Sequence, residues 1–313
     1  VLYRARPEDK TRLVRLAQER GYVTGMTGDG VNDAPALRRA DVGFAMGSGT
    51  EVAREAGDIV ILDDNIASIA RAALYGRTIF KSIRKFIVFQ LTMNLCAVGV
   101  SVAGPMLGVP APITVVQMLW VNLIMDTLAG LAFAGEPPRA AYMRERPIRR
   151  GEPVFTLSML GEVLCTAAFT IGLCCWFLAS PFTRAYFGFE TQNTVFLSAF
   201  FALFILCAVA NSFNVRTPRV NLLADLRRNP AFLGIMTAVA AAQLLMVYVG
   251  GGVFRTAPLT PRELLAVLGL ALLVVPVGTV RKLLLRAIRR GKPREDREKR
   301  DDREKRARAA SAA

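Results

Sequence analysis

Carboxylate, amide and glycine residues crowd together near the start of the chain, in the stretch Thr27-Gly28-Asp29-Gly30-Val31-Asn32-Asp33-Ala34-Pro35. Mg²⁺ prefers oxygen ligands, usually one or two carboxylates completed by water and phosphate, and Asp29 and Asp33 supply such oxygens. Gly28 and Gly30 let the backbone turn sharply and come close to a ligand. A lone Gly-Asp-Gly is more often an ordinary turn. The stretch by itself therefore leaves two interpretations, a turn or a magnesium site beside a phosphate group.

The residues on either side of this acidic turn predict a strand before it and a helix after it. Val23 to Met26 is largely apolar, and Ala36 to Ala40 consists of helix-forming residues. Asp33 is suited to cap that helix, and Pro35 is suited to its first turn. In parallel α/β sheets ligands gather at the carboxyl ends of strands. The predicted order places Asp29 at such an end.

Further strands and helices are predicted after the acidic turn. Val42 to Met46 and Asp58 to Leu62 are short apolar runs typical of buried strands, and a helix capped by Thr50 is predicted between them. Strands that alternate with helices predict a parallel sheet. Asp63 and Asp64 follow the last strand, and we favour turn and helix-cap roles for them over a second metal pair.

The rest of the chain has the composition of a membrane protein. Of its 313 residues 53% are hydrophobic, and the mean hydropathy of +0.35 is too high for an ordinary soluble domain. A helical pattern that starts at Ile66 continues past Lys85 into apolar sequence, which predicts one long helix that enters the bilayer. A spanning helix needs about 20 mostly apolar residues, and we predict six, at about residues 86–106, 114–134, 157–179, 194–214, 231–249 and 264–280.

The charge distribution predicts how these spans are oriented. Much of the net charge of +15 lies in two loops, residues 139–150 and 215–229, and in the tail after Val280. The positive-inside rule then places residues 1–76, both loops and the tail, taken as residues 283–313, in the cytosol. The mixed charge of the tail is typical of a solvated segment, and binding of anionic lipid is the weaker alternative. Because the charge follows topology and lacks interleaved aromatic residues, a partner nucleic acid is not expected.

The cysteine positions and the lack of histidine bear on disulfides and metal sites. The five cysteines all lie in apolar runs, and the chain has no histidine. We therefore interpret the cysteines as packing residues rather than as disulfides or metal ligands.

Polar groups inside membrane spans are costly and often functional, and three in the first two predicted spans are candidates for a site. Asn94 lies in the first span, and Asn122 and Asp126 lie four residues apart in the second, on one helical face. An ionised Asp126 among apolar neighbours needs a partner, and a bound cation is the simplest one. Hydrogen bonding between helices is the alternative for each asparagine.

Two stretches of the chain resemble the P-type cation-transporting ATPases. Thr27 to Leu37, TGDGVNDAPAL, is similar to the hinge motif of their phosphorylation domain, which is of the haloacid-dehalogenase type. Val116 to Leu128, followed by Glu136-Pro137-Pro138, is similar to the sixth membrane helix of their calcium-pumping members, above all the plasma-membrane type. The resemblance implies an α/β part of a haloacid-dehalogenase-like phosphorylation domain at residues 1–76. It also implies a stalk and an all-α bundle of six transmembrane helices at residues 77–282.

The resemblance further implies roles for residues of the acidic turn. In the family, the first aspartate of the hinge motif ligates Mg²⁺ beside the phosphorylated aspartate, and the Asn-Asp pair helps to hold the phosphoryl site. A lysine upstream contacts the phosphoryl group, although a lysine at a helix start is more often simply solvated. These catalytic roles fall on Lys10, Asp29, Asn32 and Asp33, with Asp29 and Asp33 as the Mg²⁺ contacts and Thr27, Gly28 and Gly30 as support for the phosphoryl loop.

In the membrane, the resemblance implies that Asn94, Asn122 and Asp126 are ligands of transported Ca²⁺. Calcium takes about six to eight oxygens, so these residues form only part of a site. The reticulum-type pumps, which carry two calcium ions, have glutamate where Ala97 stands and threonine where Met125 stands, and they have a further glutamate in the eighth helix. We therefore predict one Ca²⁺ per cycle. Another cation, Mn²⁺, Na⁺ or H⁺, is the alternative.

The resemblance covers only the carboxyl part of a pump. The sequence has no DKTGT loop with the aspartate that becomes phosphorylated. That loop, the nucleotide domain that binds most of the ATP, the actuator domain and the first four membrane helices would belong to amino-terminal domains. We therefore expect a multi-pass protein of the plasma membrane that is inactive without those domains. The alternative is a non-catalytic membrane subunit.

Overall fold

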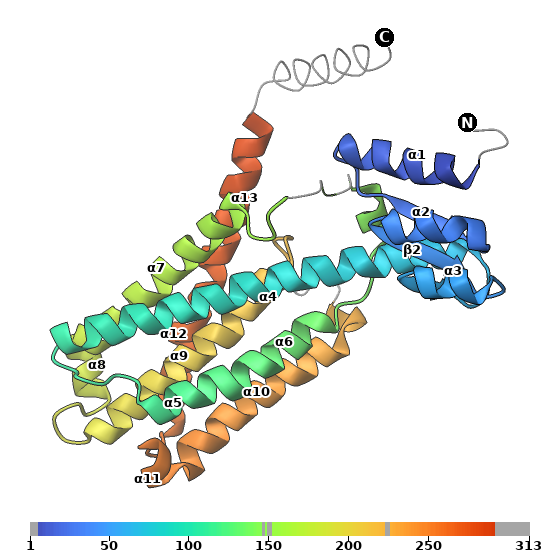
Figure 1. The fold of residues 1–313 in the computed structure, drawn as a ribbon. Coiled ribbons are helices and arrows are strands. Elements are labelled where there is room, and N and C mark those ends of the chain that lie inside the picture. The colour runs from blue at the N-terminus through green and yellow to red at the C-terminus, as the bar shows by residue number, and fades with distance from the viewer. Residues whose placement is uncertain (1–5, 146–147, 149–151, 223–225, 292–313) are drawn as a thin grey trace. The chain divides into compact units, whose positions relative to one another are not determined.

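The computed structural model describes residues 6–145, 148, 152–222 and 226–291 (Figure 1). The chain folds as two compact units, one of Val1–Arg84 with Glu136–Thr156 and the other of Lys85–Gly135 with Leu157–Ala313. The long helix α4 (Ile66–Met106) begins in the first unit and ends in the second.

The first unit is built on a three-stranded parallel sheet in the order β1-β2-β3. Gly25 pairs with Val42 in the first ladder, and Phe44 pairs with Ile59 in the second. The alternation of strands and helices in the sequence is thereby confirmed. The elements are α1 (Pro7–Glu19), β1 (Gly25–Gly28), η1 (Val31–Asp33), α2 (Ala34–Arg39), β2 (Val42–Met46), α3 (Glu51–Ala56), β3 (Ile59–Ile61) and η3 (Ala140–Arg144).

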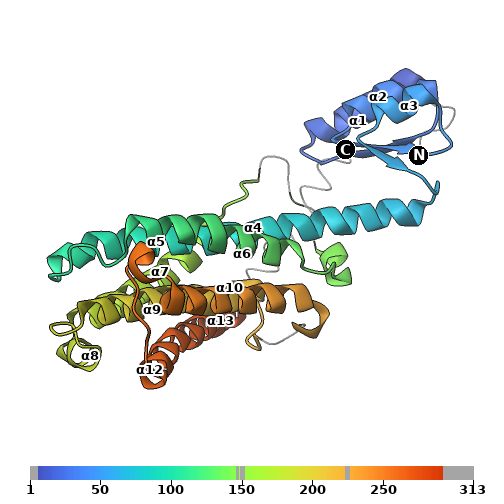
Figure 2. The same ribbon diagram turned by 90° about the horizontal axis from the view of Figure 1, so that it is seen from below.

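The core of this sheet is made of small side chains. Figure 2 shows α2 and α3 on one face of the strands, as expected for crossovers of one hand between neighbouring parallel strands. The core residues are Ala34 and Leu37 of α2 and Ala53 and Ala56 of α3, with Met26 of β1 packed against them. Because all but two of these side chains are alanine, the helices lie close to the sheet.

Two boundaries differ from the predicted ones. We predicted the first strand at Val23 to Met26, but β1 begins at Gly25 and takes in the first residues of the motif. Thr24 stays outside the ladder because its N–H and hydroxyl both donate to Oδ2 of Asp41, at 2.9 Å each. The following helix starts at Ala34 rather than Ala36, because η1 leads directly into it with Pro35 in its first turn.

A basic face of α4 holds the segment after residue 135 within the first unit. Arg77 donates through Nη1 to the carbonyls of Tyr142 (2.7 Å) and Glu145 (2.9 Å). Lys81 forms an ion pair with Glu145 at 2.6 Å, and Arg84 pairs with Glu152 at 3.4 Å.

The second unit is helical, and the described residues contain six stretches long and apolar enough to cross a membrane. They are 66–106, 115–134, 157–179, 193–216, 230–249 and 261–288, which confirms the six predicted spans. The elements after α4 are α5 (Val115–Trp120), η2 (Val121–Met125), α6 (Asp126–Ala134), α7 (Leu157–Ala179), α8 (Pro181–Tyr186), α9 (Asn193–Arg216), η4 (Leu226–Arg228), α10 (Pro230–Val249), α11 (Gly251–Phe254), α12 (Pro261–Leu272) and α13 (Val274–Gly291).

The helix continues past the predicted end of the last span. We predicted residues 264–280, and the helical stretch that contains this span runs from Pro261 to Ile288, with α13 continuing to Gly291. The break between the two helices lies where Pro276 has no N–H to donate to the carbonyl of Leu272. The predicted tail, residues 283–313, therefore begins inside a helix, and its residues 292–313 lie outside the described part of the chain.

Helix α9 is the most enclosed of the six candidate spans, because 72% of its apolar 18-residue stretch is buried. Polar contacts connect its C-terminal end to α13. Lys282 of α13 donates to the carbonyl of Asn214 at 2.7 Å, and the amide of Asn214 donates to the carbonyl of Val274 at 2.9 Å. Arg281 forms an ion pair with Glu162 of α7 at 2.7 Å. Helix α13 therefore satisfies polar groups on two earlier helices.

Candidate functional sites

The acidic turn brings Lys10 and Asp33 together from α1 and η1. Lys10 Nζ donates to Oδ1 of Asp33 at 2.5 Å, and the Asp33 side chain is only 9% exposed. Oδ2 of the same carboxylate accepts from the backbone N–H groups of Asp29 (3.3 Å) and Gly30 (3.4 Å). Both oxygens of Asp33 are therefore engaged within the fold.

These contacts decide the charge of Asp33. Burial by itself disfavours the carboxylate and would raise the pKa of Asp33. The hydrogen bond from Lys10 and those from the Gly30 and Asp29 N–H groups, together with the lysine charge, outweigh burial and lower the pKa below its ordinary value. Asp33 is consequently an anion at neutral pH, paired with a cation.

Asp29 and Asn32 have the opposite environment. Both side chains are exposed, and neither makes a hydrogen bond to another described residue. The backbone of Asp29 is nevertheless fixed, because its carbonyl accepts from the N–H of Thr50 at 2.8 Å. Asp29 follows directly on β1, which ends at Gly28. The turn therefore presents one free carboxylate on a held backbone.

Gly28 is required by the position of Asp33. A Cβ built on Gly28 would lie 2.9 Å from Oδ2 of Asp33 and closer still to its Cβ, whereas one on Gly30 would meet nothing nearer than 4.0 Å. We expect Gly28→Ala to lower the free energy of unfolding by about 1–3 kcal/mol, as other overpacked substitutions do. The measurement is thermal unfolding of the chain, with amide hydrogen exchange of β1 and α2.

The matched control is Gly30→Ala, one position beyond Asp29 in the same turn. Gly30 has extended backbone angles, φ −113° and ψ 165°, that alanine also adopts. We expect a change of less than about 1 kcal/mol for it. Equal effects of the two substitutions would contradict the role assigned to Gly28.

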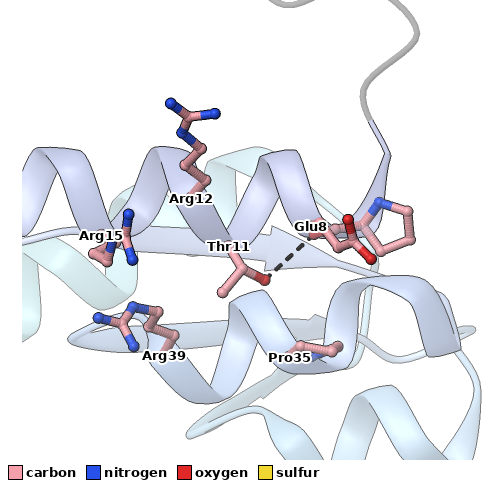
Figure 3. Close-up of a pocket in the computed structure, with 7 residues that line it drawn as sticks. Glu8, Thr11, Arg12, Arg15, Pro35 and Arg39 are labelled. Carbon is pink, nitrogen blue, oxygen red and sulfur yellow. Dashed lines mark hydrogen bonds between the residues drawn. The ribbon is translucent and has the colours of Figure 1, made fainter.

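A groove of about 450 Å³ lies between α1 and α2, in the same unit. Figure 3 shows Arg15 and Arg39 near each other at one end, Glu8 at the other, and Arg12 pointing away. Thr11 in the middle donates its hydroxyl to the carbonyl of Pro7 at 3.3 Å. Because none of the predicted site residues lines the groove, we assign it no part in the chemistry of the turn.

The second candidate site is centred on Asp126, which is 7% exposed. Gln90 of α4 donates through Nε2 to Oδ2 of Asp126 in a very short hydrogen bond. The other oxygens of this pair, Oδ1 of Asp126 and Oε1 of Gln90, are buried and have no hydrogen-bond partner among the described residues. Two buried oxygens without donors, on side chains joined by a hydrogen bond, suit a cation bound by oxygen ligands.

A wide helical turn positions Asp126. Residues Val121–Met125 form a π-helix between α5 and α6, in which the N–H of Asp126 bonds to the carbonyl of Val121. Such turns are rare and are frequently found at functional sites. We predicted a single span at about residues 114–134 and did not foresee this wider turn.

The three predicted membrane ligands differ in how far their side chains are exposed. Asp126 is buried against Gln90, whereas Asn94 and Asn122 are exposed on the unit. Gln90 was not identified as a candidate ligand from the sequence, although its spacing offered a signal. It lies four residues before Asn94, the same spacing that separates Asn122 from Asp126.

A family model described as "Cation transporting ATPase, C-terminus" matches residues 110–284 of the chain. The chain belongs to the cation-transporting ATPases. This ATPase chain is 38% identical over 294 residues to "Calcium-transporting ATPase 8, plasma membrane-type" of Arabidopsis thaliana, covering 90% of this chain and 27% of that protein. It is 42% identical over 249 residues to "Calcium-transporting ATPase 7, plasma membrane-type" of Oryza sativa subsp. japonica, covering 79% of this chain and 24% of that protein.

The predicted resemblance to the carboxyl part of calcium-pump-type ATPases is thereby confirmed. This ATPase chain spans about a quarter of the length of the curated relatives it matches, 27% and 24% for the two named above. A solved structure titled "Conformational changes in the catalytic domain of the CPx-ATPase CopB-B upon nucleotide binding" shares 40% identity over 21% of this chain and 26% of that one. Its TM-score of 0.20 is too low to establish a common fold.

Proposed function

We propose that the chain is the carboxyl part of an ATP-driven pump that exports Ca²⁺ through an aspartyl-phosphate cycle, one ion per cycle. The observation that carries the proposal is Asp126, a buried carboxylate with an unpartnered oxygen at a π-helical turn of an apolar span. Buried carboxylates in spans are rare and mark ion pathways. The names of the plasma-membrane-type relatives favour Ca²⁺ as the ion.

In this proposal residues 1–76 are the carboxyl part of a haloacid-dehalogenase-like phosphorylation domain. The parallel sheet and the position of Asp29 after β1 support it. Asp29, with its exposed carboxylate, would hold Mg²⁺, which supplies charge neutralisation at the phosphoryl group. Both oxygens of Asp33 already accept hydrogen bonds, so its role would be to orient Lys10 toward the phosphoryl group.

The remaining residues of the turn would complete that site. Asn32 is exposed next to Asp33 and would contact the phosphoryl group. Thr27 and Gly28 end strand β1, Gly28 leaves room for the Asp33 side chain, and the Gly30 N–H donates to its carboxylate. ATP itself would be bound mainly by other domains of the pump, which also supply the phosphorylated aspartate.

In the membrane, Asn94, Asn122 and Asp126 would be ligands of the transported ion. The exposed positions of the two asparagines suit contact with further helices of the pump, which would supply the other oxygens that calcium takes. Residues 77–282 would form the stalk and spans of a plasma-membrane protein. Residues 1–76, the basic loops and the tail 283–313 would be cytosolic by the positive-inside rule.

The test is ATP-dependent uptake of ⁴⁵Ca²⁺ by inside-out vesicles from cells that produce the pump with this carboxyl part. We expect uptake that requires Mg²⁺ and ATP and that persists in the presence of excess Na⁺. Parallel assays measure uptake of Mn²⁺ from the medium and movement of H⁺ into the vesicles, and so distinguish these cations from Ca²⁺. Transport of one of those ions without Ca²⁺ uptake would contradict the proposal.

A further inference from the structure

We infer that Gln90 is a further ligand of the transported cation, with its Oε1 and Oδ1 of Asp126 contacting the same ion. This inference rests on the proposed function and extends it to a residue that neither sequence motif contains. It starts from the one hydrogen bond that joins α4 to the π-helical span, from Gln90 Nε2 to Asp126 Oδ2.

The nitrogen and the oxygen of the Gln90 amide have different roles in this arrangement. Nε2 donates to one oxygen of Asp126 and holds the carboxylate in place. Oε1 of Gln90 and the second oxygen of Asp126 are then left buried, and neither has a hydrogen-bond partner among the described residues. A cation between these oxygens would satisfy both at once, whereas a hydrogen-bond acceptor would satisfy neither.

The register of the two helices extends this pair into a polar ladder. Phe86 of α4 packs against Gly130 of α6, where an added Cβ would lie 3.4 Å from the ring. One turn further along α4, Gln90 meets Asp126. Asn94 follows about one turn further along α4 and Asn122 about one turn before Asp126, and both side chains are exposed. Gln90, Asn94, Asn122 and Asp126 are called the polar ladder below. On the side of Phe86 and Gly130 the facing residues are apolar. Gln90 and Asp126 are therefore the last polar residues of the ladder at that end.

The ladder also suits a single divalent ion. Its four side chains carry one carboxylate and three amides, so they contribute a single negative charge. Calcium accepts amide and carboxylate oxygens alike. A glutamate at position 90 would instead place a second carboxylate directly against Asp126, and this repulsion would strengthen the requirement for a divalent ion.

The experiment measures phosphorylation of the complete pump by ATP at buffered free Ca²⁺ for the wild type, Gln90→Leu and Gln90→Glu. We expect Gln90→Leu to raise the half-saturating Ca²⁺ concentration at least about tenfold. Gln90→Glu keeps an oxygen at the site and is expected to retain Ca²⁺-dependent phosphorylation. Phosphorylation by inorganic phosphate without Ca²⁺ should be unchanged in both, because it does not require the ion site.

The matched control is Asn211→Leu in α9. Asn211 is also buried, at 2% exposure, and neither of its amide atoms has a hydrogen-bond partner among the described residues, so it makes no hydrogen bond to Asp126. We expect no shift in half-saturating Ca²⁺ for it. Unchanged Ca²⁺ dependence in Gln90→Leu, or an equal shift in Asn211→Leu, would overturn the inference and leave the pump proposal intact. A wild type without any Ca²⁺-dependent phosphoenzyme would instead overturn the proposed function.

Discussion

Asp126→Asn is expected to abolish Ca²⁺-dependent phosphorylation of the pump by ATP. The substitution removes the only negative charge of the polar ladder and leaves its shape nearly unchanged. Removing one partner of a buried charge pair costs about 3–5 kcal/mol, which corresponds to a rise in half-saturating Ca²⁺ of about 100-fold or more. The measurement is the phosphoenzyme level over a range of buffered free Ca²⁺.

The control for Asp126→Asn is phosphorylation by inorganic phosphate in the absence of Ca²⁺. That reaction uses the cytosolic site alone, so the variant should retain it if the protein is folded. Undiminished Ca²⁺-dependent phosphoenzyme in Asp126→Asn would remove Asp126 from the ion site and with it the observation on which the proposed function rests.

Asp29→Asn is expected to have the second large effect, and on both phosphorylation reactions. Asp29 is the exposed carboxylate of the acidic turn, and loss of a magnesium ligand at a phosphoryl group removes several kcal/mol of charge stabilisation. We expect phosphorylation by ATP and by inorganic phosphate to slow by about 100-fold or more, without a change in half-saturating Ca²⁺. Rapid-quench measurement of phosphoenzyme formation at several Mg²⁺ concentrations tests this.

Glu55→Gln serves as the control for Asp29→Asn. Glu55 is an exposed carboxylate of α3 in the same unit and makes no ion pair with a described residue. It should phosphorylate at the wild-type rate. If the two variants slowed the reaction equally, or if high Mg²⁺ made no difference to Asp29→Asn, the magnesium role of Asp29 would be wrong.

Local patterns predicted the elements of this chain well. The parallel strands β2 and β3, the Thr50 cap and the long helix from Ile66 follow from apolar runs and capping residues close in sequence. The six spans follow from length and composition, because the bilayer demands about 20 apolar residues whatever the neighbours are.

Contacts between elements far apart in sequence could not be predicted in the same way. Lys10 and Asp33 are 23 residues apart, and Gln90 and Asp126 are 36 apart. Each pair depends on how two elements pack, which spacing alone does not encode. The π-helix at Val121–Met125 is similar, because its apolar residues would equally form an ordinary helix. Its wider turn depends on tertiary packing around Asp126 rather than on local propensity.

The contacts between α13 and α9 have a consequence for how the chain is made. Ribosomes synthesise α9 well before α13, yet the amide of Asn214 donates to the carbonyl of Val274 and its own carbonyl accepts from Lys282, both in α13. In a lipid environment unpaired polar groups are costly. These polar groups of the most enclosed span therefore stay without their α13 partners until α13 itself has been made. A chain truncated before Lys282 would leave the Asn214 carbonyl without this donor.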